Sequence, residues 1–169
     1  MTQTQLGRSR TFSWHDPSPT AAHLGSRSGL ELLRAVIDGE VPPPPALEMI
    51  GMDGFVAEHG RVTVSMTPQE FHYNPLGTVH GGVLAMLLDT ATGCAVHSTL
   101  PAGLGYTTVD LTTKFVRQVT VDTGQLRCEG VVLSAGRRTA LAEARLTDGR
   151  GRLIAHATST CMLFGTSER

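Results

Sequence analysis

The sequence predicts an α+β fold in which an antiparallel β-sheet wraps one long central helix. Residues 80–98 form an apolar run with the length of a buried helix and a single formal charge, at Asp89. Segments of alternating apolar and polar residues follow, and no helical segments are interleaved among them. A sheet without helical crossovers between its strands is expected to be antiparallel.

The expected strands show period-two alternation and are separated by short turns. Ahead of the helix, residues 47–57 and 61–66 flank His59-Gly60 as a predicted hairpin. Glycines mark two later turns, at Ala135-Gly136 and at residues 148–151. The strands expected after the helix are residues 106–117, 125–133, 139–146 and 152–163.

An N-terminal extension is predicted ahead of this domain. Residues 1–27 mix Ser, Thr, Pro, Arg and Gly with little periodicity, which is typical of a flexible tail. Ser28 and Glu31 match a capping box, and apolar residues continue at helical spacing up to Gly39. The prolines at 42–45 predict a stiff connector, so residues 28–45 are read as a short helix and a Pro-rich link. The main domain is then expected at 46–164, with a C-terminal tail at 165–169.

Composition and charge exclude several classes of protein. The chain has 169 residues and a net charge of -1, so no nucleic-acid partner is expected. The N-terminus lacks the basic-then-apolar order of a signal peptide, and Asp89 interrupts the longest apolar run. Neither export nor membrane insertion is therefore expected, and a cytoplasmic location is predicted. Cys94, Cys128 and Cys161 are odd in number and widely spaced, which favours buried reduced thiols over a disulfide framework or a metal site.

Asp89 is the most informative residue of the chain. A carboxylate within an apolar helix needs a partner or a chemical task, because burying an unpaired charge is costly. The segment that leads into the helix, residues 74–82, supplies an amide side chain at Asn74 and three glycines. This combination indicates a functional site at the start of the helix.

The residues around the helix form a specific pattern. It reads Asn74-Pro75-x-Gly77-x-x-His80-Gly81-Gly82, followed after five residues by Leu88-Asp89-x-Ala91-x-Gly93. Together with the order of elements, this pattern resembles the hotdog-fold acyl-CoA thioesterases of the phenylacetic-acid-degradation (PaaI-like) type. The resemblance covers roughly residues 46–164. It implies a hotdog fold and hydrolysis of an acyl-CoA, with an aryl or medium-chain acyl group, to free acid and CoA.

The resemblance also implies roles for individual residues. The acid that matches Asp89 is the general base or nucleophile in that family, the glycine that matches Gly81 supplies an oxyanion N–H, and the matching Asn orients thioester or water. A hydroxyl on the strand after the helix often assists, and Thr107 and Thr108 both fit that position. No cofactor is implied, because coenzyme A is part of the substrate.

Physical chemistry supports these roles but leaves alternatives open. The first N–H groups of a helix are unpaired and partly positive, and Gly81 and Gly82 leave them approachable for a thioester oxygen. The glycines could instead only permit a tight helix start. Asn74 could bridge its own turn, and His80 could serve packing rather than donate to substrate.

Asp89 itself has two interpretations. A carboxylate in an apolar pocket gains basicity by desolvation and can activate water or attack a thioester. The alternative is an interface ion pair, with Arg137 or Lys114 as the partner.

Substrate-binding residues leave a weaker signal. Gly136, Arg137 and Arg138 lie at a predicted hairpin in the position where related enzymes meet the phosphates of coenzyme A, although two arginines at a turn can equally be solvated surface charge. The acyl pocket is expected to be apolar, from residues such as Met52, Phe55 and Leu84.

Helix geometry predicts an oligomer. Gly81 and Asp89 are separated by about 12 Å along one helix, too far for both to touch one carbonyl carbon. Two central helices packed antiparallel across a two-fold axis would bring Gly81 of one subunit near Asp89 of the other. A homodimer, or a dimer of dimers, with sites at the subunit interface is therefore expected. Two other classes stay open, a non-catalytic acyl-CoA sensor and a hotdog acyl-thioester hydratase or dehydratase.

Overall fold

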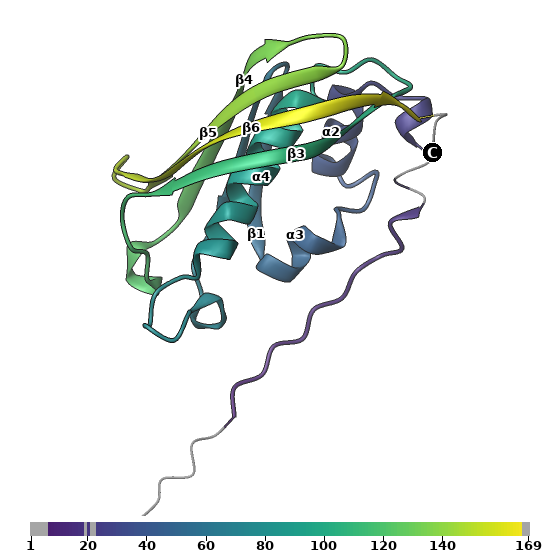
Figure 1. The fold of residues 1–169 in the computed structure, drawn as a ribbon. Helices are drawn as coiled ribbons and strands as arrows, with labels where there is room; N and C mark the ends of the chain where they lie inside the picture. Colours follow the sequence, from purple (N-terminus) through teal and green to yellow (C-terminus); the bar gives the residue numbers. More distant parts are fainter. Residues whose placement is uncertain (1–6, 19, 21–22, 167–169) are drawn as a thin grey trace, which may run out of the picture.

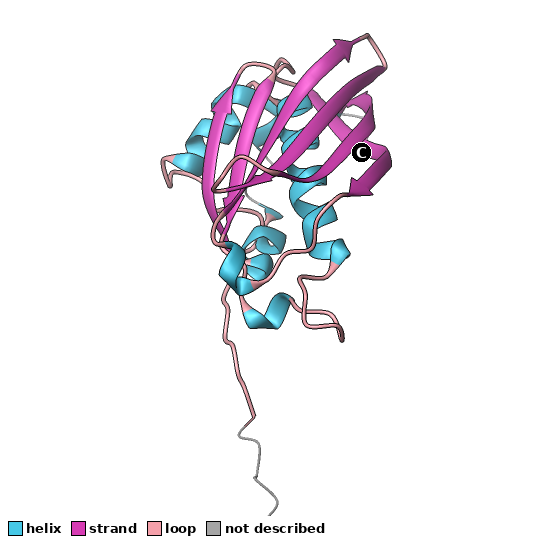
Figure 2. Ribbon diagram, turned by 90° about the vertical axis from the view of Figure 1, so that its left-hand side faces the viewer, coloured by secondary structure: helices cyan, strands magenta, loops and turns pink. Residues whose placement is uncertain are grey.

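Figure 1 shows the computed structural model, which describes residues 7–18, 20 and 23–166. Six antiparallel strands form one sheet in the order β1-β2-β4-β5-β6-β3. The sheet curls around the long helix α4 (Gly81–His97), as Figures 1 and 2 show from two directions. This is the predicted α+β architecture, the hotdog fold. The strands are β1 (Met52–Glu58), β2 (Arg61–Met66), β3 (Leu104–Phe115), β4 (Leu126–Ala135), β5 (Thr139–Asp148) and β6 (Leu153–Gly165).

The concave face of the sheet packs on α4 through alternating side chains. Val62, Val64 and Met66 of β2 are fully buried on this face. On β4, a Cβ added at Gly130 would lie 2.2 Å from the Ala91 carbonyl oxygen of α4. A glycine is therefore required there, because any side chain would push the sheet away from the helix.

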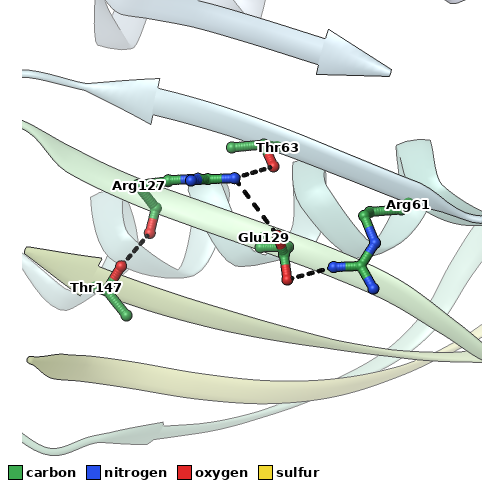
Figure 3. Close-up of polar contacts among 5 residues, drawn as sticks. All are labelled: Arg61, Thr63, Arg127, Glu129 and Thr147. Carbon is green, nitrogen blue, oxygen red and sulfur yellow. Dashed lines mark hydrogen bonds and ion pairs between the residues drawn. The ribbon is translucent and has the colours of Figure 1, made fainter. Parts of the chain in front are cut away.

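The opposite face of the central strands β2 and β4 carries charged and hydroxyl side chains. Figure 3 shows Glu129 of β4 between two arginines, 2.7 Å from Arg61 and 3.5 Å from Arg127. Arg127 also donates to the Thr63 hydroxyl, and its carbonyl accepts a bond from Thr147. This alternation of buried apolar and exposed polar residues fixes the register of the central strands, because a slip of one residue would exchange the two faces.

A short helix packs against the last turn of α4. Helix α2 (Gly29–Ile37) begins at Ser28, whose side chain and that of Glu31 form the predicted capping box. At Gly29 an added Cβ would lie 1.7 Å from the His97 carbonyl oxygen, so α2 starts in direct backbone contact with the end of α4. The elements ahead of the sheet therefore cover one end of the central helix.

One predicted element is wrong. The sequence predicts an extended connector through Pro45 and a strand that begins at residue 47. In the structure, Pro45–Ile50 form helix α3, and β1 starts only at Met52. Proline at the first helical position is pre-organised for a helix, and Gly51, in the left-handed region at φ +66°, ends it. The other predicted strands and the long helix agree with the structure to within two residues at each end.

Short segments connect these elements or precede them. In the described part of the chain, three short 3-10 turns are η1 (His23–Gly25), η2 (Glu70–His72) and η3 (Val121–Thr123). Residues 7–16 have neither helix nor strand, and Arg10 bonds the Glu48 and Met49 carbonyls while its guanidinium lies 4.0 Å from the Phe71 ring centre. Residues 1–6, 19, 21–22 and 167–169, parts of the two predicted tails, lie outside the described residues. No helix in the described part of the chain is long and apolar enough to cross a membrane.

Candidate active site

Asp89 lies in the middle of α4, half-buried, where β3 crosses the helix. The Thr108 hydroxyl of β3 donates a hydrogen bond to Asp89 Oδ1 at 2.9 Å. Thr107 is exposed on the other side of the strand, because successive residues of a strand point to opposite faces. The structure thus brings Thr108, and not Thr107, to the carboxylate.

The ion pair considered for Asp89 is not formed within the chain. Among the described residues, no lysine or arginine lies within ion-pairing distance of the Asp89 carboxylate. Lys114 is exposed on β3, and Arg137 is exposed in the β4–β5 hairpin. The carboxylate is therefore held by a neutral hydroxyl and keeps its second oxygen for another partner.

The two glycines that begin α4 differ in whether their N–H groups are hydrogen-bonded. His80 is the N-cap residue, and its Nδ1 accepts a hydrogen bond from the Gly82 N–H at 2.9 Å. No hydrogen-bond partner for the Gly81 N–H is found in the part of the chain that the structure describes. Gly81 lines a cavity of about 270 Å³ together with Phe115 and Val119. The residue with the unpaired N–H at this helix N-terminus therefore borders an open space.

His80 and Asn74 have structural tasks in this chain. The exposed His80 imidazole caps the helix, as described above. The Asn74 side chain accepts bonds from the Leu76 and Thr78 N–H groups and donates to the Thr78 hydroxyl at 3.0 Å. Asn74 thus organises the turn that leads into α4. This is the second of the two roles considered for it from the sequence, in which Asn74 bridges its own turn.

Gly136, Arg137 and Arg138 form the exposed end of the β4–β5 hairpin. The hairpin closes with a hydrogen bond from the Gly136 N–H to the Thr139 carbonyl, and the Arg138 carbonyl accepts one from Leu163. Arg137 lines a broad depression of about 790 Å³ that extends to the residues after α4. Both arginines are exposed, and Arg137 shares this depression with Thr99 and Leu100, which follow the end of α4 opposite Gly81.

The three residues expected in the acyl pocket do not line one cavity. Met52 and Phe55 of β1 share a cavity of about 270 Å³ beside α3. Leu84 lies near the start of α4, in the cavity with Gly81. Phe55 also lines a second cavity, which the sequence did not predict, with Cys94, His97 and Tyr106. Among these residues, only His97 could have been found from its spacing, because Asp89, Gly93 and His97 follow one another at successive turns of the helix.

Titratable side chains line that second cavity. Burial raises the pKa of the Cys94 thiol to about 12 and lowers the pKa of His97 below its usual range. All three cysteines are free thiols, as expected, with Cys128 and Cys161 buried and Cys94 half-buried. In the described residues, no group of three or more His, Cys, Asp or Glu side chains could hold a metal ion.

Comparison with known proteins identifies the family of this region. Residues 76–155 match the model of the thioesterase superfamily. A Halobacterium salinarum protein named "Putative esterase" is 38% identical over 69 residues, which span 40% of this chain and 44% of that protein. The match thus spans less than half the length of this curated relative.

Solved structures show the same fold. A phenylacetic acid degradation-related protein from Ralstonia eutropha JMP134 superposes with a TM-score of 0.70 at 29% identity, over 77% of this chain and 98% of its own. A Streptococcus mutans UA159 protein bound to acetyl-CoA gives a TM-score of 0.60 at 26% identity, over 68% and 88% of the two chains. The resemblance predicted from the motif around the helix is confirmed: the chain carries a thioesterase-superfamily region at residues 76–155 within a hotdog fold.

Proposed function

We propose that the protein hydrolyses an acyl-CoA thioester to a free acid and CoA, with Asp89 as the general base or nucleophile and the Gly81 N–H as the oxyanion donor. The observation that carries this proposal is the Asp89 carboxylate, which accepts a bond from Thr108 and has no cation beside it among the described residues. A carboxylate oriented by a neutral donor retains its capacity to accept a proton.

The chemistry requires two chains. Gly81 and Asp89 lie eight residues apart on α4, which is about 12 Å, so a single subunit cannot place both on one carbonyl. A stripe of α4, formed by Ala85, Met86, Asp89 and Thr90, remains partly exposed, and β3 is an edge strand of the sheet. On β3, Val109 and Phe115 are 56% and 51% exposed. These features favour an isologous dimer with α4 helices antiparallel and two equivalent sites.

In such a site, Asp89 of one subunit removes a proton from water as the water oxygen attacks the thioester carbonyl carbon. The Gly81 N–H of the other subunit stabilises the negative oxygen of the tetrahedral intermediate. The carbon–sulfur bond then breaks, and the thiolate leaves and takes up the proton as the CoA thiol. If Asp89 attacks directly, water cleaves the resulting anhydride and gives the same products.

The S. mutans neighbour supports coenzyme A as the carrier, because that protein is bound to acetyl-CoA. The exposed pair Arg137 and Arg138 supplies guanidinium groups suited to its phosphates. The acyl group is proposed to be aryl or medium-chain.

Release of free thiol from a panel of acyl-CoAs tests the activity, with paired variants to test the residues. Asp89→Asn keeps the shape and loses the base, so kcat should fall by roughly 10² to 10⁴. Gly81→Pro removes the proposed donor at the first helical position, where proline is well tolerated. His80 has φ -61° and ψ 134°, which is suitable for a residue before proline.

Gly81→Ala is the matched control, because it adds the same Cβ contact to Phe115 but retains the N–H. We expect Gly81→Pro to lose roughly 10² to 10³ in kcat and Gly81→Ala to lose much less. Near-normal turnover by folded Asp89→Asn protein, or equal losses in the two Gly81 variants, would contradict the assigned roles.

A further inference from the structure

An N-terminal segment, drawn in purple below α3 in Figure 1, connects α3 to the 3-10 turn η2. Arg10 of this segment donates hydrogen bonds to the Glu48 carbonyl, at 3.0 Å, and to the Met49 carbonyl, both in α3. The same guanidinium lies 4.0 Å from the ring centre of Phe71 in η2. One cationic side chain therefore joins two elements that the β1–β2 hairpin separates in the sequence.

These contacts suit an arginine. The last carbonyls of a helix have no partner within the helix and carry partial negative charge, so a basic side chain at that end is favourable. A guanidinium also packs favourably on an aromatic ring. His72 of η2 completes the arrangement, because its Nε2 donates to the Ile50 carbonyl at 2.9 Å. The last three carbonyls of α3 are thus bonded by Arg10 and by a residue of η2.

The turn η2 is in turn connected to the start of α4. The His72 carbonyl accepts a hydrogen bond from the His80 N–H at 2.8 Å. A second contact, from the Val79 N–H to the Val119 carbonyl at 2.8 Å, links the same place to the segment after β3. The two residues before Gly81 are therefore held from two directions, and one of these runs through η2 to the arginine.

We propose that Arg10 is a positioning residue for the Gly81 N–H: it holds η2 on α3, and η2 fixes the place at which α4 begins. This assignment rests on the proposed function, in which that N–H stabilises the thioester oxygen. Such a donor is effective because it is aligned before the reaction, and a displacement of about 1 Å caused far from the chemistry can cost about a hundredfold in rate. Arg10, α3 and η2 all precede the matched region at residues 76–155, so the family match does not cover this arrangement.

Arg8 provides a matched control on the same segment. Its guanidinium lies 2.6 Å from the Glu70 carboxylate, but the two side chains are 66% and 58% exposed. Exposed ion pairs contribute little, because water and salt screen them. Arg8→Ala therefore removes the same charge from the same segment and leaves the bonds of Arg10 in place.

Steady-state hydrolysis of one acyl-CoA compares the arginine variants. We expect Arg10→Ala to lower kcat about 5- to 50-fold, less than loss of the donor itself, and to change KM by less than about twofold. Arg10→Lys should recover part of the loss, because an ammonium keeps the charge but lacks the planar fork. Arg8→Ala should remain close to wild type. A wild-type kcat in Arg10→Ala, or an equal loss in Arg8→Ala, would overturn the proposal.

A double variant tests whether Arg10 acts through η2. Phe71→Leu removes the ring on which the guanidinium packs, whereas Phe71→Tyr keeps an aromatic face and should remain close to wild type. If the two residues act through one contact, the kcat of Arg10→Ala/Phe71→Leu should equal that of Arg10→Ala alone. Losses that multiply would show that the two side chains act separately and would contradict the proposed route.

Hydrogen exchange of the full chain, read by mass spectrometry on peptides, tests the positioning without any measurement of activity. The Gly82 N–H is bonded to His80 Nδ1, and the N–H groups of Val83 and Leu84 are bonded to the His80 carbonyl. In Arg10→Ala these amides should exchange about tenfold faster, while the middle of α4 exchanges as in wild type.

Two exchange results would overturn the proposal. Unchanged exchange in the first turn of α4 would mean that Arg10 does not hold the start of the helix. An equal increase along the whole of α4 would mean that Arg10 stabilises the fold in general. If wild-type protein hydrolyses no acyl-CoA, the proposed function fails, and the exchange result by itself decides whether Arg10 positions the start of α4.

Discussion

The Thr108 hydroxyl donates a hydrogen bond to Asp89 Oδ1 at 2.9 Å, and this contact joins the edge strand β3 to the middle of α4. It orients the carboxylate without neutralising it, since a hydroxyl carries no charge. Of the polar contacts in the proposed site, this one connects sheet and helix, so its removal tests whether orientation of Asp89 matters for turnover.

Replacement of Thr108 by Val should lower kcat by about tenfold to a hundredfold, the equivalent of a hydrogen bond to a charged group. Thr108→Ser keeps the hydroxyl and should remain close to wild type. Thr107→Val is the positional control, because Thr107 is exposed on the opposite face of the strand. Steady-state hydrolysis of one acyl-CoA by the three variants gives the comparison, and a similar loss in Thr107→Val would argue against a specific role of Thr108.

The choice between Thr107 and Thr108 shows what the sequence could not determine. Alternation along residues 106–117 is evident in the sequence, but which side of the strand meets the helix depends on pairing with β6, where a register shift lies between Thr108 and Asp110. The helix around Asp89 was predictable because its apolar run is long and its first residues carry a specific motif.

Other features depended on tertiary packing. The residues 47–50 resembled the start of a strand locally, yet they continue a helix that Pro45 begins. The cavity at His97 arises only when α2 and α3 pack over the end of α4, so Met52, Phe55 and Leu84 could not be assigned to pockets from their apolar character alone. Contacts between distant segments, rather than local pattern, decide such positions.

The arginine pair at the β4–β5 hairpin predicts a carrier-specific effect. If Arg137 and Arg138 hold the phosphates of coenzyme A, replacing both by Ala should raise KM for acyl-CoA and weaken its dependence on salt. Hydrolysis of a short thioester without the nucleotide should be almost unchanged. Measuring both substrates at two ionic strengths makes the comparison, and equal losses on both would indicate a role in folding or assembly instead.

Two buried histidines predict how stability depends on pH. His72 accepts a hydrogen bond from the Gln69 N–H at Nδ1 and donates one from Nε2 to the Ile50 carbonyl, so both nitrogens of the neutral ring are paired. Burial lowers the pKa of His72 and of His97 below their ordinary value of 6.5. Between the folded and unfolded pKa values, the unfolded chain binds more protons than the folded one. The free energy of unfolding should therefore fall as the pH drops below about 6.5.

Urea unfolding between pH 5 and 8 measures this dependence. Each histidine can contribute at most about 1.4 kcal/mol per pH unit. The free energy of unfolding of His97→Phe should depend less steeply on pH, because the contribution of His97 is removed. His59→Gln, a change at an exposed position, should keep the wild-type slope. A stability that does not change between pH 5 and 6.5 would show that neither buried ring resists protonation.

The shared site can be tested by combining two inactive chains. If Gly81 and Asp89 act from different subunits, a mixed dimer of Gly81→Pro and Asp89→Asn chains has one doubly defective site and one intact site, while each parent homodimer has no intact site. Random reassortment makes about half of the dimers mixed, so equal amounts of the two variants should recover about a quarter of wild-type activity. Native mass spectrometry confirms the mixed species. If mixed dimers form and activity stays at the sum of the parents, each chain builds its own site and the antiparallel pairing of α4 helices is wrong.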